Sequence, residues 1–420
     1  MADKSPLDEP IYRDSRGEIR RHNINDTKFN ILTSKAGSIR SGDYHPSIQF
    51  DIILKGEVKI TLRKEDKDIE IVKKDNEFIS IPENTPHLFE FTKDTVMIEW
   101  WDKPFEAKFY EPYREKVLNN IKRKILVTGA AGLLGSNVVF EGLNQNYEMY
   151  GCYLNNKVKI PNANLIKLDL SKETAIKEIE KINPDCIIHC AGLVNLDSLE
   201  QNPLEAESHI VKATKNVAIA SKKTNSQLIY ISTDALFDGK KGNYTEEDTP
   251  NPINVYGKAK LKAEEEIKKE YERHTIIRTN IYGWNLQENK FSLAEWMLNK
   301  LRSKEEFTGF EDVVYSPIST NNLSKILFEI FKKNYYGTLN IGPKNPCTKL
   351  EFAQKLAKIF DLDQSLIKSG NSNSMKFKAK RPKNVSLNTE KAQKMFNIKT
   401  INEDLLDFKG LENENNQDRK

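Results

Sequence analysis

Apolar and polar positions alternate along the first third of the chain, in short runs that are broken by charged turns. A period of two is typical of strands with one buried face. We therefore predict an all-β domain, a small antiparallel barrel or sandwich, over residues 1–113. Its strands are expected at residues 29–33, 49–54, 57–62, 69–72, 77–81, 87–91 and 95–100.

The pattern changes after a predicted linker at residues 114–121. Short continuous apolar runs then alternate with helical stretches, which is typical of a parallel sheet with helices on both faces. We predict a doubly wound Rossmann-type α/β domain over residues 122–408, with a small C-terminal lobe and a polar tail at 409–420. The main expected strands are 122–128, 147–154, 164–168, 186–190 and 227–231, and amphipathic helices are expected at 291–301 and 348–360.

A glycine turn, Gly129-Ala-Ala-Gly132-Leu-Leu-Gly135, joins the first of these strands to a helical run. Strand, turn and helix in this order predict a dinucleotide site, in which the glycines let backbone, pyrophosphate and helix approach closely. The phosphates are expected at the helix N-terminus, where free N–H groups attract anions. The expected cofactor contacts are Gly129, Ala131, Gly132, Leu133, Leu134, Gly135, Asn155, Lys157, Asp169, Leu170, Ala191, Gly192, Tyr256 and Lys260.

The end of the second strand carries Asn155, Asn156 and Lys157, where an NAD-selective site usually has Asp or Glu. No carboxylate there repels a 2′-phosphate, and Lys157 can attract one. The sequence therefore favours NADP(H) over NAD(H). The alternative is that Lys157 is only a loop charge.

A candidate catalytic group follows the strand at 227–231. Tyr256 and Lys260 are four residues apart, so on a helix they share one face. A neighbouring ammonium is expected to lower the Tyr pKa, and Thr233 can hold the same substrate oxygen. These three residues predict proton transfer to or from a carbonyl or carbinol oxygen during hydride transfer. The alternative is a solvated Lys beside a half-buried Tyr.

Residues 122–405 resemble the extended short-chain dehydrogenase/reductases, specifically the dTDP-4-dehydrorhamnose reductase group. The resemblance rests on segments in the right order: Gly129–Gly135, Ser232–Gly239, residues 251–260, 278–283, 316–320, 337–342 and 381–387.

This resemblance implies that hydride passes from the nicotinamide to a keto carbon of a nucleotide-diphosphate sugar of the 4-keto-6-deoxy type. Such chemistry serves polysaccharide or deoxysugar biosynthesis. Tyr256 would protonate the new oxygen, Lys260 would tune Tyr256 and bond the nicotinamide ribose, and Thr233 would orient the carbonyl. The residues expected at the substrate are Asp234, Arg278, Trp284 and Arg381. For either Arg an internal salt bridge is the alternative.

The chain departs from the family pattern in three places. Ala235 stands where Tyr is usual, and His209 stands where Asn is usual. The turn after the fourth strand reads Ala191-Gly192-Leu193, where Ala-Ala-Tyr or Ala-Ala-Phe is usual. These departures bear on the substrate rather than the cofactor. Two other functions stay open. One is an NAD-dependent nucleotide-sugar epimerase, and the other is a non-catalytic subunit that holds a dinucleotide and binds a partner enzyme.

The N-terminal third loosely resembles the cupins through Gly42–Gln49, Gly56-Glu-Val and Pro82–His87. This resemblance predicts a cupin-like barrel in which Asp43, His45, Gln49 and His87 hold a divalent metal. The alternative is a metal-free barrel with both His residues at its mouth. An added sugar isomerase or epimerase activity is a further hypothesis.

Composition narrows the classes of function. The 420 residues carry a net charge of +4 from 65 basic and 61 acidic side chains, without a zinc finger or basic arm, so nucleic acid is not an expected partner. No apolar run suits a membrane span and no signal peptide is evident, and the four Cys lack a disulfide spacing. We expect a cytoplasmic enzyme, and the family resemblance implies a homodimer.

Overall fold

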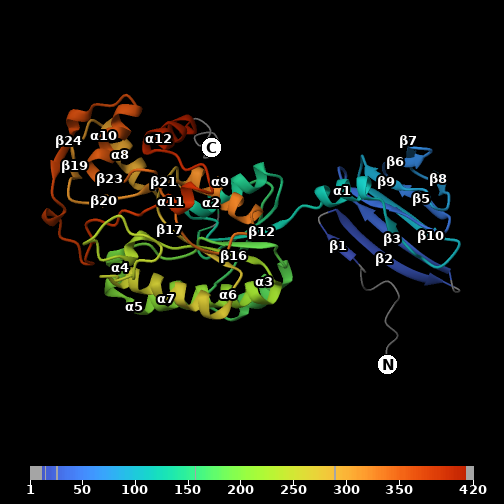
Figure 1. The fold of residues 1–420 in the computed structure, drawn as a ribbon, viewed down its shortest axis with the longest axis horizontal. Coiled ribbons are helices and arrows are strands. Elements are labelled where there is room, and N and C mark those ends of the chain that lie inside the picture. Colours follow the sequence, from blue (N-terminus) through green and yellow to red (C-terminus); the bar gives the residue numbers. More distant parts are fainter. Residues whose placement is uncertain (1–11, 15, 25–26, 157, 288–289, 413–420) are drawn as a thin grey trace. The chain divides into compact units, whose positions relative to one another are not determined.

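The computed structural model describes residues 12–14, 16–24, 27–156, 158–287 and 290–412. The chain forms two compact units, Met1–Lys122 and Arg123–Lys420 (Figure 1). Lys157 and most of the predicted polar tail lie outside the described residues. Within the described ranges no helix is long and apolar enough to cross a membrane.

The first unit contains two antiparallel sheets. One has the strand order β1 (Tyr12–Asp14), β2 (Gly17–Ile24), β3 (Thr27–Ser34), β10 (Thr95–Trp101), β5 (Gln49–Lys55) and β8 (Phe78–Ile81). The other has the order β11 (Lys108–Phe109), β4 (Ile39–Tyr44), β9 (His87–Phe91), β6 (Glu57–Lys64) and β7 (Lys67–Lys74). All seven predicted strands are present. The two sheets keep separate edges in the described part of the chain, so the predicted closed barrel is not confirmed.

Alternation along these strands directs one row of side chains inward, as a half-buried sheet requires. Ile53, Val58, Ile60, Phe89 and Met97 are fully buried and form the centre of this core. The periodicity did not reveal β2 and β4, because polar side chains such as His22 and Arg40 occupy buried positions in them.

A helix, α1 (Glu111–Asn120), covers most of the stretch predicted as a linker. It packs on β4, and its Tyr113 and Val117 are buried against Leu88 of β9. The side-chain oxygen of Asn120 accepts a hydrogen bond of 2.7 Å from the backbone N–H of Ile39. This helix therefore belongs to the core of the first unit.

The second unit is built on a sheet of seven parallel strands. Their order is β14 (Asn164–Lys167), β13 (Glu148–Tyr153), β12 (Lys124–Thr128), β15 (Cys186–His189), β16 (Gln227–Ile231), β17 (His274–Arg278) and β22 (Gly337–Asn340). The chain builds the sheet outward in both directions from β12, which confirms the doubly wound Rossmann-type arrangement. Ligands of such sheets bind beyond the carboxyl ends of the strands, at the point where the order reverses. Here that point lies between β12 and β15.

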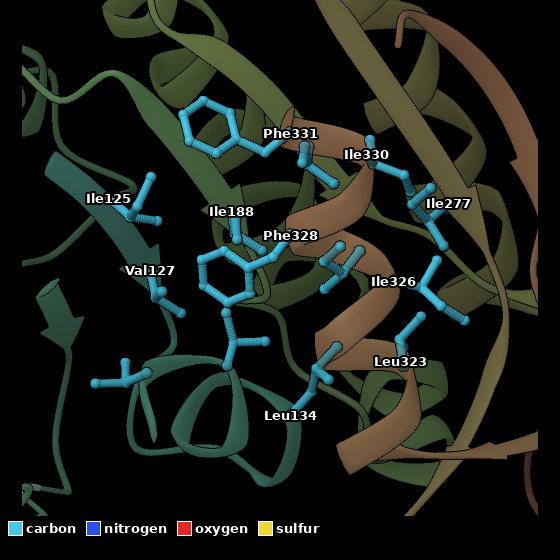
Figure 2. Packing of buried hydrophobic residues seen from close by; sticks show 14 of the residues in the cluster. Ile125, Val127, Leu134, Ile188, Ile277, Leu323, Ile326, Phe328, Ile330 and Phe331 are labelled. Atoms are coloured by element: carbon cyan, nitrogen blue, oxygen red, sulfur yellow. The ribbon is translucent and has the colours of Figure 1, made fainter. Parts of the chain in front are cut away.

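Helices cover both faces of this sheet (Figure 1). α2 (Leu133–Asn144) and α9 (Thr320–Lys332) pack on one face, with Phe328 beside Val127 and Ile188 (Figure 2). α3 (Thr174–Ile182), α6 (Ala213–Thr224) and α7 (Val255–Glu270) pack on the other face, against Leu126 and Leu228. Because both faces are buried, the strands are apolar throughout, as parallel sheets require.

A smaller lobe has its own core, in which Trp284, Phe352 and Phe408 pack together. Its helices α8 (Leu293–Arg302) and α10 (Lys349–Ile359) match the two predicted amphipathic helices, and each begins with a capping box. The remaining elements are α4 (Leu196–Gln201), α5 (Pro203–Ala206), η1 (Glu207–Lys212), η2 (Asp234–Leu236), β18 (Asn280–Tyr282), β19 (Phe307–Phe310), β20 (Val314–Tyr315), β21 (Pro317–Ser319), β23 (Cys347–Thr348), η3 (Gln364–Leu366), β24 (Ile367–Gly370), η4 (Ser372–Ser374), α11 (Glu390–Gln393) and α12 (Ile401–Gly410).

Candidate functional site

The glycine turn lies at the carboxyl end of β12 and opens α2. Gly129 has a φ of +66°, and a Cβ there would be 2.8 Å from the Cα of Ala191. A Cβ on Gly135 would be 2.2 Å from the carbonyl oxygen of Gly129. Both contacts are too short for any side chain, so glycine is required at these positions. Gly132 is the N-cap of α2, which leaves the first N–H groups of that helix without side-chain partners.

Two neighbouring cavities of about 260 and 490 Å³ share the glycine turn and the loop after β15. The smaller one extends to the ends of β13 and β14, and the larger one extends to β16 and α7. Together they are lined by every predicted cofactor residue that the structure describes: Gly129, Ala131, Gly132, Leu133, Leu134, Gly135, Asn155, Asp169, Leu170, Ala191, Gly192, Tyr256 and Lys260. The sequence therefore identified a set of residues that the fold brings together.

The smaller cavity also contains residues that the prediction omitted. His209, from the π-helical segment η1, and Gln287 both line it. The Gln287 side-chain amide donates a hydrogen bond to the carbonyl oxygen of Ala131 in the glycine turn. The Asp169 carboxylate accepts from both the N–H and the hydroxyl of Ser171, which lowers the pKa of Asp169. His209 was noticed as a departure from the family, but Gln287 lies outside every motif.

Thr233, Tyr256 and Lys260 line the larger cavity together with Asp234. Thr233 follows β16 and caps η2, because its hydroxyl accepts a hydrogen bond of 3.1 Å from the N–H of Ala235. α7 begins immediately before Tyr256, where the Asn254 side chain accepts from the N–H of Gly257 at 2.8 Å. Tyr256 and Lys260 then lie one turn apart on the same helix face.

The electrostatics of Tyr256 differ from the prediction. Burial raises the pKa of Tyr256 to about 12, partly offset by a hydrogen bond with Thr233. Lys260 does not lower it, because its ammonium donates instead to the carbonyl oxygen of Ile231 at 2.6 Å and lies 4.2 Å from the ring centroid of Tyr230. Burial also lowers the pKa of Lys260 to about 7. Burial thus favours a protonated Tyr256 hydroxyl that can donate, and it disfavours the charged form of Lys260.

Asp234 lies deeper in the same cavity and is 3% exposed. Its carboxylate accepts a hydrogen bond of 2.9 Å from the side chain of Asn280, yet burial raises the pKa of Asp234 to about 6. Lys349, the first residue of α10, interacts electrostatically with Asp234 and lies 3.6 Å from the ring centroid of Tyr315. Burial lowers the pKa of Lys349 to about 8. Lys349 was not among the predicted site residues, although a Lys at the start of a predicted helix was a usable signal.

Asp234 should make stability depend on pH. The pKa of Asp234 is higher in the folded state than the ordinary value of 3.8, so folding favours the protonated carboxyl. The stability of the second unit is therefore highest below pH 3.8 and falls as the pH rises through about 6. We expect the free energy of unfolding of Asp234→Asn, relative to that of the natural protein, to rise by up to about 3 kcal/mol from pH 4 to pH 7. Hydrogen exchange of β16 and β17 peptides at both pH values measures the difference. The exposed Asp361→Asn is the control, and an equal pH dependence of all three proteins would contradict the assignment.

The other predicted substrate residues have internal partners. Arg278 is buried, and its guanidinium donates to Glu264 at 2.8 and 3.2 Å, so the salt-bridge alternative holds. Trp284 donates its indole N–H to the carbonyl oxygen of Phe408 at 2.9 Å and belongs to the core of the lobe. Arg381 pairs with Asp197 at 3.0 Å and remains partly exposed. None of these three residues lines either of the two cavities, so their contact with a substrate stays a prediction.

The predicted metal ligands lie in the first unit. One ligand atom from each of Asp43, His45 and His87 falls within 4.8 Å of the other two. Gln49 is also buried, and its sequence position is close to that of His45. Its amide nitrogen, however, donates to the Asp51 carboxylate at 3.1 and 3.2 Å. Three of the four predicted residues thus form one cluster.

The sheet order, the glycine turn and the two joined cavities define an NAD(P)-binding Rossmann fold in the second unit. Residues 123–406 match the family described as RmlD substrate binding domain, and the chain belongs to this family. The first unit lies outside the matched range.

Among curated relatives, methionine adenosyltransferase 2 subunit beta of Rattus norvegicus is 29% identical over 286 residues, which cover 66% of this chain and 84% of the relative. The "Probable low-salt glycan biosynthesis reductase Agl14" of Haloferax volcanii is 26% identical over 271 residues, which cover 64% of this chain and 90% of the relative.

Solved structures show the same fold. A hypothetical dTDP-4-dehydrorhamnose reductase from Sulfolobus tokodaii is 31% identical, with a TM-score of 0.59, 66% of this chain covered and 95% of that chain. The dTDP-4-dehydrorhamnose reductase from Bacillus anthracis in complex with NADP is 24% identical, with a TM-score of 0.61, 69% of this chain covered and 99% of that chain.

Proposed function

We propose that this protein reduces the keto group of a nucleotide-diphosphate sugar with NADPH. The observation that carries the proposal is one continuous site. Thr233, Tyr256 and Lys260 line the same cavity as the glycine turn, so a dinucleotide held at the turn can reach the three side chains. Two compared proteins are named as dTDP-4-dehydrorhamnose reductases and one as a glycan biosynthesis reductase, which supports the substrate class.

The residues present fit a dinucleotide. Gly129 and Gly135 let the turn, the loop after β15 and α2 pack closely, and the free N–H groups at the start of α2 suit a pyrophosphate. When bound, the nicotinamide would supply the hydride. Asn155, Asp169 and His209 line the smaller cavity, where the adenosine half would lie.

Tyr256 would deliver the proton in this reaction. Its raised pKa keeps the hydroxyl protonated at neutral pH, so it can donate to the oxygen on which negative charge develops. The Thr233 hydroxyl would orient that oxygen from the end of β16. Lys260 would hold the ribose next to the nicotinamide after leaving the carbonyl of Ile231. Asp234, with Lys349 behind it, would contact sugar hydroxyls beside the small Ala235.

A preference for NADPH follows from the lack of a carboxylate at the end of β13. Asn155 and Asn156 line the smaller cavity there. We expect Asn155→Asp to weaken NADPH relative to NADH by about tenfold, which corresponds to about 1.4 kcal/mol of repulsion with the 2′-phosphate. Fluorescence titration with both cofactors measures the ratio. Asn162→Asp, on an exposed loop, is the matched control, and an unchanged ratio in Asn155→Asp would contradict the preference.

A second candidate function is a non-catalytic role as a subunit of another enzyme. It is favoured by the relatives named methionine adenosyltransferase 2 subunit beta. The similarity to those relatives covers 66% of this chain at 29% identity. The intact Thr233, Tyr256 and Lys260 favour the reductase. A nucleotide-sugar epimerase with retained NAD is the other alternative, and a homodimer and a cytoplasmic location remain predictions.

The proposed function is tested by following the absorbance of NADPH in the presence of a panel of 4-keto-6-deoxy nucleotide sugars. Consumption of NADPH with one of them supports the reductase and identifies its substrate. Tight dinucleotide binding without consumption on any sugar would contradict it. In that case, stimulation of a methionine adenosyltransferase catalytic subunit by this protein would support the second candidate.

A further inference from the structure

One lysine of the second unit stands where the fold disfavours a positive charge. Lys349 is the first residue of α10, so its ammonium opposes the helix dipole, and burial lowers its pKa to about 8. The helix does not need this charge for its start, because Thr348 and Glu351 form a complete capping box. Departures from local rules of this kind are expected at functional sites.

The Lys349 ammonium acts on the carboxyl group of Asp234. Its charge opposes the rise that burial causes in the pKa of Asp234, and it lies 3.6 Å from the ring centroid of Tyr315. In the described part of the chain this ammonium makes no hydrogen bond and no ion pair within 4 Å. Lys349 therefore favours the ionised form of Asp234 without occupying the oxygens of its carboxylate.

The carboxylate of Asp234 keeps room for a further donor. One oxygen accepts a hydrogen bond of 3.3 Å from the Thr233 hydroxyl, and the other accepts one of 2.9 Å from the Asn280 amide. A carboxylate offers about four lone-pair positions, so about two stay free. Asp234 lines the larger cavity, and an ionised carboxylate only accepts. The ligand group that matches it is therefore a donor, such as a hydroxyl.

Two further titratable groups interact electrostatically with Asp234, namely Tyr256 on α7 and Tyr315 on β20. Burial raises the pKa of both phenols, that of Tyr256 to about 12, so both are uncharged near neutral pH. The charge of Asp234 is therefore governed by its burial and by Lys349.

The place of Asp234 beside Thr233 selects one hydroxyl of the sugar. In the proposed reduction, on which this step rests, the Thr233 hydroxyl orients the keto oxygen. Because that hydroxyl and the Asp234 carboxylate are 3.3 Å apart, a group that reaches Asp234 belongs to a carbon next to the ketone. In a 4-keto-6-deoxy sugar one such carbon carries the 3-hydroxyl and the other carries the methyl group, and only the hydroxyl donates.

We propose that Asp234 binds the 3-hydroxyl of the keto-sugar, and that Lys349 is the positioning residue that keeps Asp234 in its accepting form. The substrates are then sugars with a free hydroxyl beside the keto group. Loss of a hydrogen bond to a charged group weakens binding by about 10–100-fold, so sugars without that hydroxyl are poor ligands.

The test measures, by calorimetry, the binding of dTDP-4-keto-6-deoxyglucose, its 3-deoxy analogue and the UDP forms of both. The full chain is saturated with NADP⁺, which has no hydride to give. We expect the natural protein to bind the 3-deoxy form about 10–100-fold more weakly at pH 7. Lys349→Met should lower this ratio about five- to tenfold, because Asp234 then holds a proton. The ratio should recover at pH 8.5, which a merely structural role of Lys349 does not explain.

Two variants serve as controls, and thermal unfolding shows whether each variant folds. Lys349→Arg keeps the charge and should keep the ratio, as should Lys358→Met, which removes an exposed Lys from the same helix. The proposal is overturned if the natural protein binds neither sugar or both equally, or if folded Lys349→Met has the natural ratio at pH 7.

Failure of this proposal differs from failure of the reductase, because binding and NADPH consumption are measured separately. Equal binding of both sugars by a protein that reduces them overturns the role of Asp234 and Lys349 alone. A preference for the 3-hydroxyl that depends on Lys349, without consumption of NADPH, supports that role and contradicts the reductase.

Discussion

Replacing Tyr256 with Phe is expected to lower the turnover of keto-sugar reduction by about 10²–10⁴-fold, the usual contribution of a positioned proton donor. The phenol lines the larger cavity together with Thr233, and burial keeps it protonated. Phe keeps the ring, so the binding of NADPH should change little. Steady-state kinetics with the substrate found in the panel, together with NADPH titration, separate the two effects.

The control for this variant is Tyr336→Phe. Tyr336 is 37% exposed, and its hydroxyl accepts from Arg273 before β17, at the opposite end of the strands from the cavity. This variant should keep full turnover. Unchanged turnover in Tyr256→Phe would show that another group, such as Asp234, delivers the proton.

Replacing Arg278 with Met is expected to lower the free energy of unfolding of the second unit by about 3–5 kcal/mol. Arg278 and Glu264 form an ion pair at 2.8 Å whose side chains are 3% and 0% exposed. Glu264 also accepts a hydrogen bond of 2.6 Å from the hydroxyl of Ser232, which precedes Thr233 at the end of β16. The variant leaves a buried carboxylate without its cation. Hydrogen exchange of β16 and β17 peptides reports this unit separately from the first.

Two further variants make this prediction specific. Arg278→Met combined with Glu264→Leu should recover much of the loss, because it removes both buried charges. Lys262→Met breaks an ion pair with Glu207 in which both side chains are 52% exposed, and should cost less than about 1 kcal/mol. A loss for Arg278→Met as small as that for Lys262→Met would contradict the role of the pair.

The Rossmann unit was largely predictable because its signals are local. The strand β16 has the predicted bounds, 227–231, and the glycine turn combines residue type with position between a strand and a helix. The Tyr256 and Lys260 spacing fixes a shared helix face before any tertiary contact forms. The residues predicted from such local signals line the two neighbouring cavities, and their roles there stay predictions.

Residues whose roles depend on distant partners were not predictable. Arg278 and Trp284 carry side chains that often contact ligands. In the fold Arg278 donates to Glu264, 14 residues away in the sequence, and Trp284 donates to Phe408, 124 residues away. The predicted lowering of the Tyr256 pKa was wrong for a similar reason: burial in the fold raises this pKa, and the Lys260 ammonium donates to the carbonyl oxygen of Ile231. Sequence gives residue types, whereas the competition between partners is decided in the fold.

In the first unit, alternation predicted the strands with apolar inner faces and missed those with polar ones. Gly17–Ile24 and Ile39–Tyr44 carry buried His22 and Arg40, so their pattern is not amphipathic. The cluster of Asp43, His45 and His87 was nonetheless indicated, through the loose resemblance of its segments to the cupins. Gln49 was included on sequence position alone, and the structure directs its amide nitrogen to Asp51.

The most direct test of the proposed reduction is transfer of a label. NADPH deuterated at either face of the nicotinamide C4 would be incubated with the protein and each 4-keto-6-deoxy nucleotide sugar, and the sugars would be analysed by mass spectrometry. We predict one deuterium on the carbinol carbon of one sugar from one of the two labelled cofactors, and at least about a hundredfold less of it in the same time with Tyr256→Phe. Binding of the labelled NADPH without deuterium in any sugar would contradict the reductase.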